Sequence, residues 1–167
     1  MTIRILYAKP KKWFVPISWL IRKVEGTYGS HVAIEFLLGE SHAVFDSVAP
    51  KSRLLLKYRW DEHYLALNAW EFTLAEGNVS PAISWALDNT DKDYSRLQCV
   101  LIGIGEFFGG WVQKLVWKQN PNGSEYLICV EAAARFCTQF LGLKFSSGPD
   151  VLGLKEFIDT LDQYTEK

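Results

Sequence analysis

The chain has 167 residues, of which 49% are hydrophobic and 22% are charged, and this fits one compact domain over residues 1–167. Eighteen Lys and Arg against nineteen Asp and Glu give a formal charge of −1, so no overall basic field attracts nucleic acid, and we expect none as a partner. The aromatic share of 14% is far too high for a disordered chain.

The first part of the chain predicts a strand, a helix and a β-hairpin. Residues 2–8 alternate loosely and are rich in β-formers, which indicates a strand. A helix is expected over 16–25, where Pro suits the first turn and four apolar residues recur with helical spacing: Ile17, Leu20, Ile21 and Val24. The apolar runs 31–37 and 43–48 flank a tight turn at 39–41, which is the pattern of a hairpin.

Two more strands and a second helix are predicted next. The segments 53–58 and 64–72 have strand character, and the second places an alternating set on one face: Tyr64, Ala66, Asn68, Trp70 and Phe72. Ser80 and Pro81 are typical of an N-cap and a first helical position, so a helix is expected from there to about Asp88. A polar loop follows. These strands are expected to form an antiparallel sheet.

The last third predicts two helices. A turn at 120–124 precedes a helix from near Cys129 to Leu141, with Gly142 suited to its C-terminal cap. Five residues of this helix share one face: Cys129, Ala132, Ala133, Phe136 and Phe140. Asp150 precedes a final helix with apolar residues at helical spacing. Because strands and helices are segregated along the chain, the predicted fold class is α+β rather than a wound parallel sheet.

Cysteine and histidine are too few to build a scaffold. Three cysteines without a Cys-x-x-Cys pair, and three histidines, support neither a disulfide framework nor a zinc site, so we predict no metal and no cofactor. The N-terminus lacks the apolar stretch of a signal peptide. The most apolar segment, 99–116, falls short of the roughly 20 residues that span a bilayer. These observations predict a cytoplasmic protein.

Cys129 has the chemically distinctive position among the three cysteines. Unpaired N–H groups and the positive end of the dipole at a helix N-terminus favour a thiolate over a thiol. Cys99 lies in an apolar run and Cys137 lies in mid-helix, so neither gains the same activation. Cys129 is therefore a candidate nucleophile, and a small buried hydrophobe is the alternative interpretation.

His31 and Asp46 are the candidates to act with this cysteine. His31 opens a strand at the rim of the sheet, where an imidazole could serve as a base, although an ordinary hydrogen-bonded histidine is the alternative. A two-residue hairpin loop places Asp46 on the same face, opposite His31 or Ala33, so Asp46 could orient the ring or be an ordinary strand-end carboxylate. Glu35 shares that face, but four residues at about 3.3 Å each put it roughly 13 Å away, which leaves it a supporting role at most.

These residues resemble a known family. Ser30-His31-Val32-Ala33-Ile34, followed much later by Ile128-Cys129-Val130-Glu131, is similar to the circularly permuted, NlpC-like branch of the papain-like cysteine hydrolases, the YiiX and YebB type of amidase or peptidase. In that family a Ser-His-Val-Gly-Ile strand comes first, a strand ending in an acidic residue comes second, and a Cys-Ser-Glu motif at a helix start comes last. Residues 44–47 fall where the acidic residue is expected. The resemblance covers the chain in outline from Ile17 to Leu141.

The resemblance implies a papain-like fold, with an antiparallel sheet or partial barrel packed on helices and the histidine strand before the cysteine helix. It also implies a thiol-dependent hydrolase that cleaves an amide or ester bond through Cys129, His31 and Asp46 and a thioacyl-enzyme. The substrate is a cell-wall type peptide or a lipid-linked acyl group. Acyltransferase activity is open too, because related permuted families include acyltransferases resembling lecithin retinol acyltransferase.

Two departures from the family pattern bear on this function. Ala33 replaces the usual Gly, and Val130 replaces the Ser that follows the nucleophile. Neither change removes a member of the triad, but Val130 could alter a hydrogen bond near the nucleophile. The alternative function is therefore a catalytically inactive papain-fold module that binds a partner or has a structural role.

Two further features bear on the site. The Cys129 backbone N–H is expected to hold the oxyanion, and Tyr94 is a candidate second donor by position only, with a loop aromatic that caps the core as its alternative. The segment Leu97–Trp117 is rich in Trp and Phe between glycine breaks, which fits a helix packed in the core. Its other interpretation is a flap, with Phe107, Phe108 and Trp111 toward substrate or lipid, that admits an acyl chain or contacts a membrane peripherally.

Overall fold

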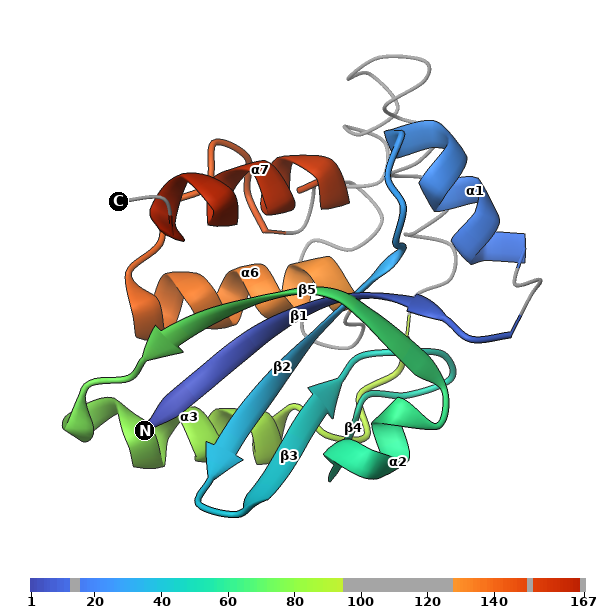
Figure 1. Cartoon of the computed structure of the whole chain (residues 1–167). Coiled ribbons are helices and arrows are strands. Elements are labelled where there is room, and N and C mark those ends of the chain that lie inside the picture. The colour runs from blue at the N-terminus through green and yellow to red at the C-terminus, as the bar shows by residue number, and fades with distance from the viewer. Residues whose placement is uncertain (13–15, 95–127, 150–151, 166–167) are drawn as a thin grey trace.

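A computed structural model describes residues 1–12, 16–94, 128–149 and 152–165 (Figure 1). It contains a five-stranded antiparallel sheet of order β4-β3-β2-β1-β5 packed against helices. The strands are β1 (Thr2–Pro10), β2 (His31–Leu38), β3 (Ser41–Asp46), β4 (Arg53–Leu56) and β5 (Tyr64–Thr73). The helices are α1 (Pro16–Glu25), α2 (Lys57–Asp61), α3 (Glu76–Asp88), α6 (Cys129–Phe136) and α7 (Leu154–Thr165). The predicted antiparallel sheet with helices packed against it is thus confirmed.

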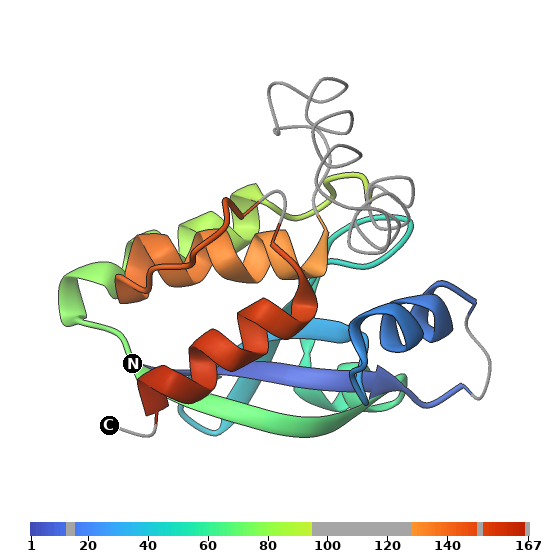
Figure 2. The ribbon, with the colours of Figure 1, turned by 90° about the horizontal axis from the view of Figure 1, so that it is seen from above.

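The two faces of the sheet are covered differently. Helices α3, α6 and α7 share a core with one face (Figure 2), and the sheet contributes alternate residues to it: Ile3, Ile5, Tyr7, Val32, Ile34, Phe36, Phe45 and Trp70. The opposite face is covered near the start of β2 by the short helix α2. A smaller buried cluster forms there from Leu6, Ala8, Ala33, Val44, Trp60 and Tyr64. Because side chains alternate along a strand, neighbouring residues of β1 and β2 belong to different clusters.

The hairpin and the cysteine helix form as the sequence predicts. Gly39 and Glu40 make the two-residue turn between Leu38 and Ser41, and Gly39 takes the left-handed conformation, with φ of 64°, that such turns favour. Helix α6 begins at Cys129, and all five residues of the predicted face are buried, four of them in α6 and Phe140 just beyond its end. It continues into a π-helical turn over Cys137–Leu141 and ends at Gly142, whose φ is 68°.

Two predicted boundaries are wrong. The strand expected over 53–58 ends at Leu56, and the next residues form α2. The helical turn places Trp60 in the buried cluster on the second face of the sheet, where it is fully buried. The helix expected to start at Ser80 starts at Glu76, so Pro81 lies inside α3. Pro81 has no N–H to donate to the preceding turn, and the buried residues of α3, Ala82 and Ala86, follow it in the core between the helices and the sheet.

The prediction of one alternating face for β5 is also wrong, and the correction matters for the site. Tyr7 pairs with Asn68 while Ala8 pairs with Ala66, so Leu67 is an extra residue that forms a β-bulge. A bulge shifts the alternation by one position. Tyr64 therefore faces the smaller cluster beside α2, whereas Trp70 faces the core under the helices.

Candidate active site

His31 is held at the start of β2 by a close approach of backbone to backbone. The Ser30 amide donates to the Ala8 carbonyl at 3.0 Å, and the Gly29 amide donates to the Tyr7 hydroxyl. A Cβ at position 29 would lie 2.5 Å from the Ala8 oxygen and 2.5 Å from the Tyr7 ring. Glycine is thus the residue that fits between β1 and the residue before His31, which fixes where the imidazole lies.

Asp46 lies at the end of β3 and meets the imidazole directly. The hairpin register pairs Ile34 with Phe45, which puts Asp46 opposite Ala33 and on the same face as His31. His31 Nε2 and Asp46 Oδ1 form a buried hydrogen bond. The other carboxylate oxygen, Oδ2, accepts two hydrogen bonds from Arg53, from Nε at 3.1 Å and from Nη2 at 2.9 Å. Both oxygens of this fully buried carboxylate are therefore engaged.

An aromatic stack supports the imidazole from below. The Tyr64 ring lies parallel to His31 with 4.5 Å between centroids, and Trp60 stacks in turn on Tyr64 at 5.1 Å. Trp60 is fully buried and comes from α2, while Tyr64 comes from the bulged end of β5. The stack and the bond to Asp46 together restrict rotation of the His31 ring.

Cys129 lies at the first position of α6, beside the same histidine. The residue before it, Ile128, is extended and has no side-chain oxygen to cap the helix, so the first amides receive no side-chain cap. The Cys129 and His31 side chains interact closely enough that each shifts the pKa of the other, and the Val32 backbone acts on the pKa of the cysteine too. Because Nε2 of His31 bonds to Asp46, Nδ1 is the ring nitrogen that is left to act on Cys129.

The pKa values of His31, Asp46 and Cys129 are shifted in the directions that favour the charged form of each side chain. Burial opposes the charged form of each, but it is outweighed by the partners. The Asp46 carboxylate raises the pKa of His31 well above its usual value, and His31 and Arg53 lower that of Asp46. Hydrogen bonding to His31 lowers the pKa of Cys129. Burial raises the pKa of the Cys137 thiol far above that of a free cysteine.

The other predicted site residues are not all brought to this place. Glu35 is on the His31 face but bonds to His42 Nδ1 at 2.8 Å and faces Arg4 at 3.8 Å, at the far end of the strand. The Tyr94 amide donates to the Pro50 carbonyl at 2.8 Å, which anchors the loop that follows β3, and its side chain is half-buried. Leu97–Trp117, with Phe107, Phe108 and Trp111, and also Cys99 lie outside the described residues.

Two residues of the site were missed by sequence reasoning. Arg53 pairs directly with Asp46 in the β3–β4 ladder, and a register argument extended by one more hairpin could have found it. Tyr64 depends on the bulge at Leu67, for which the sequence carries no glycine or other signal. Both residues act on the triad from outside it.

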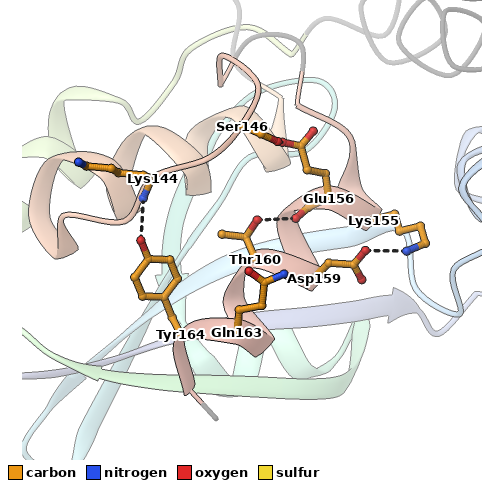
Figure 3. Close-up of a pocket in the computed structure, with 8 residues that line it drawn as sticks. All are labelled: Lys144, Ser146, Lys155, Glu156, Asp159, Thr160, Gln163 and Tyr164. Atoms are coloured by element: carbon orange, nitrogen blue, oxygen red, sulfur yellow. Dashed lines mark hydrogen bonds and ion pairs between the residues drawn. The ribbon is translucent and has the colours of Figure 1, made fainter. Parts of the chain in front are cut away.

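A pocket of about 600 Å³ lies along α7 and is lined by polar side chains (Figure 3). Several of its polar groups are bonded to one another: Lys155 pairs with Asp159 at 2.6 Å, and Thr160 donates to the Glu156 carbonyl at 2.8 Å. None of the three candidate catalytic residues lines it. We place the candidate chemistry at Cys129.

The described residues show neither a metal-binding cluster nor a membrane-spanning helix. Within the described ranges, no group of three or more His, Cys, Asp and Glu side chains is arranged to hold a metal ion. None of the helices in the described part of the chain is long and apolar enough to cross a membrane. Comparison with known proteins adds no relative: no protein-family model matches the chain, and no curated protein is significantly similar to it.

Proposed function

We propose that the protein is a cysteine hydrolase of the circularly permuted papain-like type, which cleaves an amide or ester bond with Cys129 as nucleophile. The observation that carries the proposal is a continuous chain of contacts, from Arg53 through Asp46 and His31 to a cysteine at a helix N-terminus. A nucleophile, a base that touches it and a group that orients the base are the three parts that nucleophilic catalysis requires.

The first half of the reaction acylates the cysteine. His31 Nδ1 takes the proton of the Cys129 thiol, and the thiolate forms a bond to the carbonyl carbon while the carbonyl electrons move to oxygen. The oxyanion is stabilised by the Cys129 backbone N–H at the start of α6, where no side chain caps the helix. The oxyanion then re-forms the carbonyl, the bond to the amine or alcohol breaks, and His31 gives its proton to that leaving group.

The second half releases the acyl group. His31 removes a proton from water, the hydroxide attacks the thioester carbon, and the thiolate leaves as the carboxylic acid forms. Asp46 holds the Nε2 proton throughout and stabilises the imidazolium at each stage. His31 and Arg53 together lower the pKa of Asp46 and favour its ionised form, and the Arg53 guanidinium binds the oxygen that His31 does not use. Transfer of the acyl group to an alcohol or amine would follow the same steps with that acceptor in place of water.

Acylation of the protein by an activated ester tests the proposal. Wild type and Cys137→Ala are expected to acquire an acyl group after brief incubation with p-nitrophenyl acetate and acid quenching, and Cys129→Ala is not. Cys137→Ala is a matched control, since Cys137 lies on the same helical stretch but its buried thiol has a raised pKa. Equal labelling of Cys129→Ala, or none of wild type, would favour an inactive module.

A further inference from the structure

A small pocket adjoins Cys129, and Asp46 is not among the residues that line it. It encloses about 30 Å³, and Cys129 forms part of its wall. That volume holds about one water molecule or one methyl group. Five apolar residues complete most of the lining: Ile21, Ile128, Val130, Leu152 and Leu154.

One polar atom in this wall has no partner. Ser30 lines the pocket, is 5% exposed, and its Oγ makes no hydrogen bond with any described residue. The buried hydroxyl of Ser52, by contrast, bonds to the Asn89 carbonyl and to the Lys92 amide. A buried hydroxyl without a partner is costly, and such a group in a native structure calls for an explanation. A ligand atom in the pocket would supply the missing hydrogen bond.

We propose that this pocket binds the acyl-side residue of a peptide substrate, that this residue is Gly or Ala, and that Ser30 Oγ accepts a hydrogen bond from its backbone N–H. The inference rests on the proposed hydrolase function and selects a peptide over a lipid-linked acyl group. When the scissile carbonyl lies at Cys129 Sγ, the side-chain position on its α-carbon enters the pocket, and its backbone N–H meets Ser30 at the wall. Its volume admits a hydrogen or a methyl group there. A long hydrocarbon chain exceeds that volume and offers no polar atom to Ser30.

Glu25 also lines the pocket, and its carboxylate accepts a hydrogen bond from the Lys155 amide at 2.7 Å. This hydrogen bond ties α1 to α7, which are two of the elements that form the pocket wall.

A pair of esters that differ in one group tests the hydrogen bond. N-acetylglycine and 4-oxopentanoic acid p-nitrophenyl esters have the same heavy-atom skeleton, with CH₂ in place of NH in the second. With each rate divided by the rate at which the same ester hydrolyses in buffer, wild type is expected to be acylated about tenfold faster by the N-acetylglycyl ester, the value of one ordinary hydrogen bond. Ser30→Ala is expected to bring the two rates within about twofold. Ser41→Ala, at the exposed hairpin turn, should keep the wild-type ratio.

The size limit is tested with N-acetylalanyl and N-acetylleucyl esters. Wild type should react with the leucyl ester at least tenfold more slowly, and Leu154→Ala should reduce that difference by enlarging the pocket. Equal wild-type rates for the NH and CH₂ esters, or a preference for the leucyl ester, would overturn the pocket assignment while acylation of Cys129 leaves the hydrolase function standing. If no ester acylates Cys129, both proposals fail. The wild-type comparisons decide the matter even if a variant does not fold.

Discussion

The ring of Tyr64 stacks on the imidazole of His31, with 4.5 Å between centroids and 19° between planes. The contact exists because a single extra residue, Leu67, shifts the alternation of β5 and turns Tyr64 toward the face that carries His31 and Asp46. A change in an edge strand therefore determines how firmly the imidazole is held.

Removal of the Tyr64 ring is expected to loosen His31. Tyr64→Ala should lose about 3 kcal/mol of unfolding free energy, typical of a buried aromatic truncated to alanine, and should lower kcat for ester hydrolysis about tenfold. Tyr64→Phe keeps the stack and should cost less than about 1 kcal/mol with nearly unchanged kcat. Thermal or denaturant unfolding and steady-state kinetics measure both effects. A Tyr64→Phe enzyme as impaired as Tyr64→Ala would show that the hydroxyl, not the stack, matters.

Asp46→Asn is expected to keep the fold and to lower kcat by about 100-fold or more, because an amide orients the ring but does not stabilise the imidazolium. Glu35→Gln is the matched control, since Glu35 is also buried and lies on the same face of the sheet, but it bonds to His42 instead of His31. Its kcat should stay within about twofold of wild type. Similar losses in both variants would mean that general destabilisation, and not orientation of His31, explains the Asp46 effect.

The parts of the site that the sequence predicts are those with local signals. A two-residue turn at Gly39 fixes the hairpin register, and side-chain alternation then puts Asp46 on the His31 face. The helix that begins at Cys129 could be predicted because its apolar residues recur at helical spacing and Gly142 marks the end of the helical stretch. Pairing over short sequence distances and helical periodicity were enough for these three residues.

The parts that could not be predicted depend on tertiary packing. The helical turn of α2 forms because Trp60 finds a place under the sheet, although residues 53–58 have the pattern of one strand. The bulge in β5 leaves no mark on its alternating sequence. Pro81 is typical of a helix start, yet α3 begins at Glu76, one turn earlier, and no pattern in residues 76–79 indicates this. The pocket lined by Ser30 and Cys129 is formed by residues that lie far apart in the sequence, so no local sequence pattern predicts it.

Gly29→Ala is expected to destabilise the protein by roughly 2 kcal/mol or more, because the new methyl group would lie 2.5 Å from backbone at Ala8. Gly77→Ala in α3 is the control: nothing lies within 4 Å of its Cβ position, and alanine favours the helix, so it should be neutral or stabilising by up to about 1 kcal/mol. Urea unfolding of both variants checks this. Equal stabilities would mean that β1 and the Gly29 turn are not packed so closely.

Stability in acid is expected to depend on Asp46. Its pKa is lower in the folded state than the ordinary 3.8, so its stabilising contribution is full above that pH and is lost as the pH falls through the folded value. The unfolding free energy of wild type should therefore drop more steeply than that of Asp46→Asn in this acid range. Parallel pH profiles for the two proteins, measured by urea unfolding, would contradict an ionised, paired Asp46.

The pH dependence of Cys129 alkylation tests the central claim most directly. Iodoacetamide labelling followed by peptide mapping should give a rate whose midpoint lies below 9.0, the ordinary thiol value, because His31 stabilises the thiolate. His31→Ala should move that midpoint upward, and Cys137 should stay unreactive at neutral pH because burial raises its pKa. A midpoint at the ordinary value that His31→Ala leaves unchanged, or faster labelling of Cys99 or Cys137 at neutral pH, would contradict the assignment of Cys129 as an activated nucleophile.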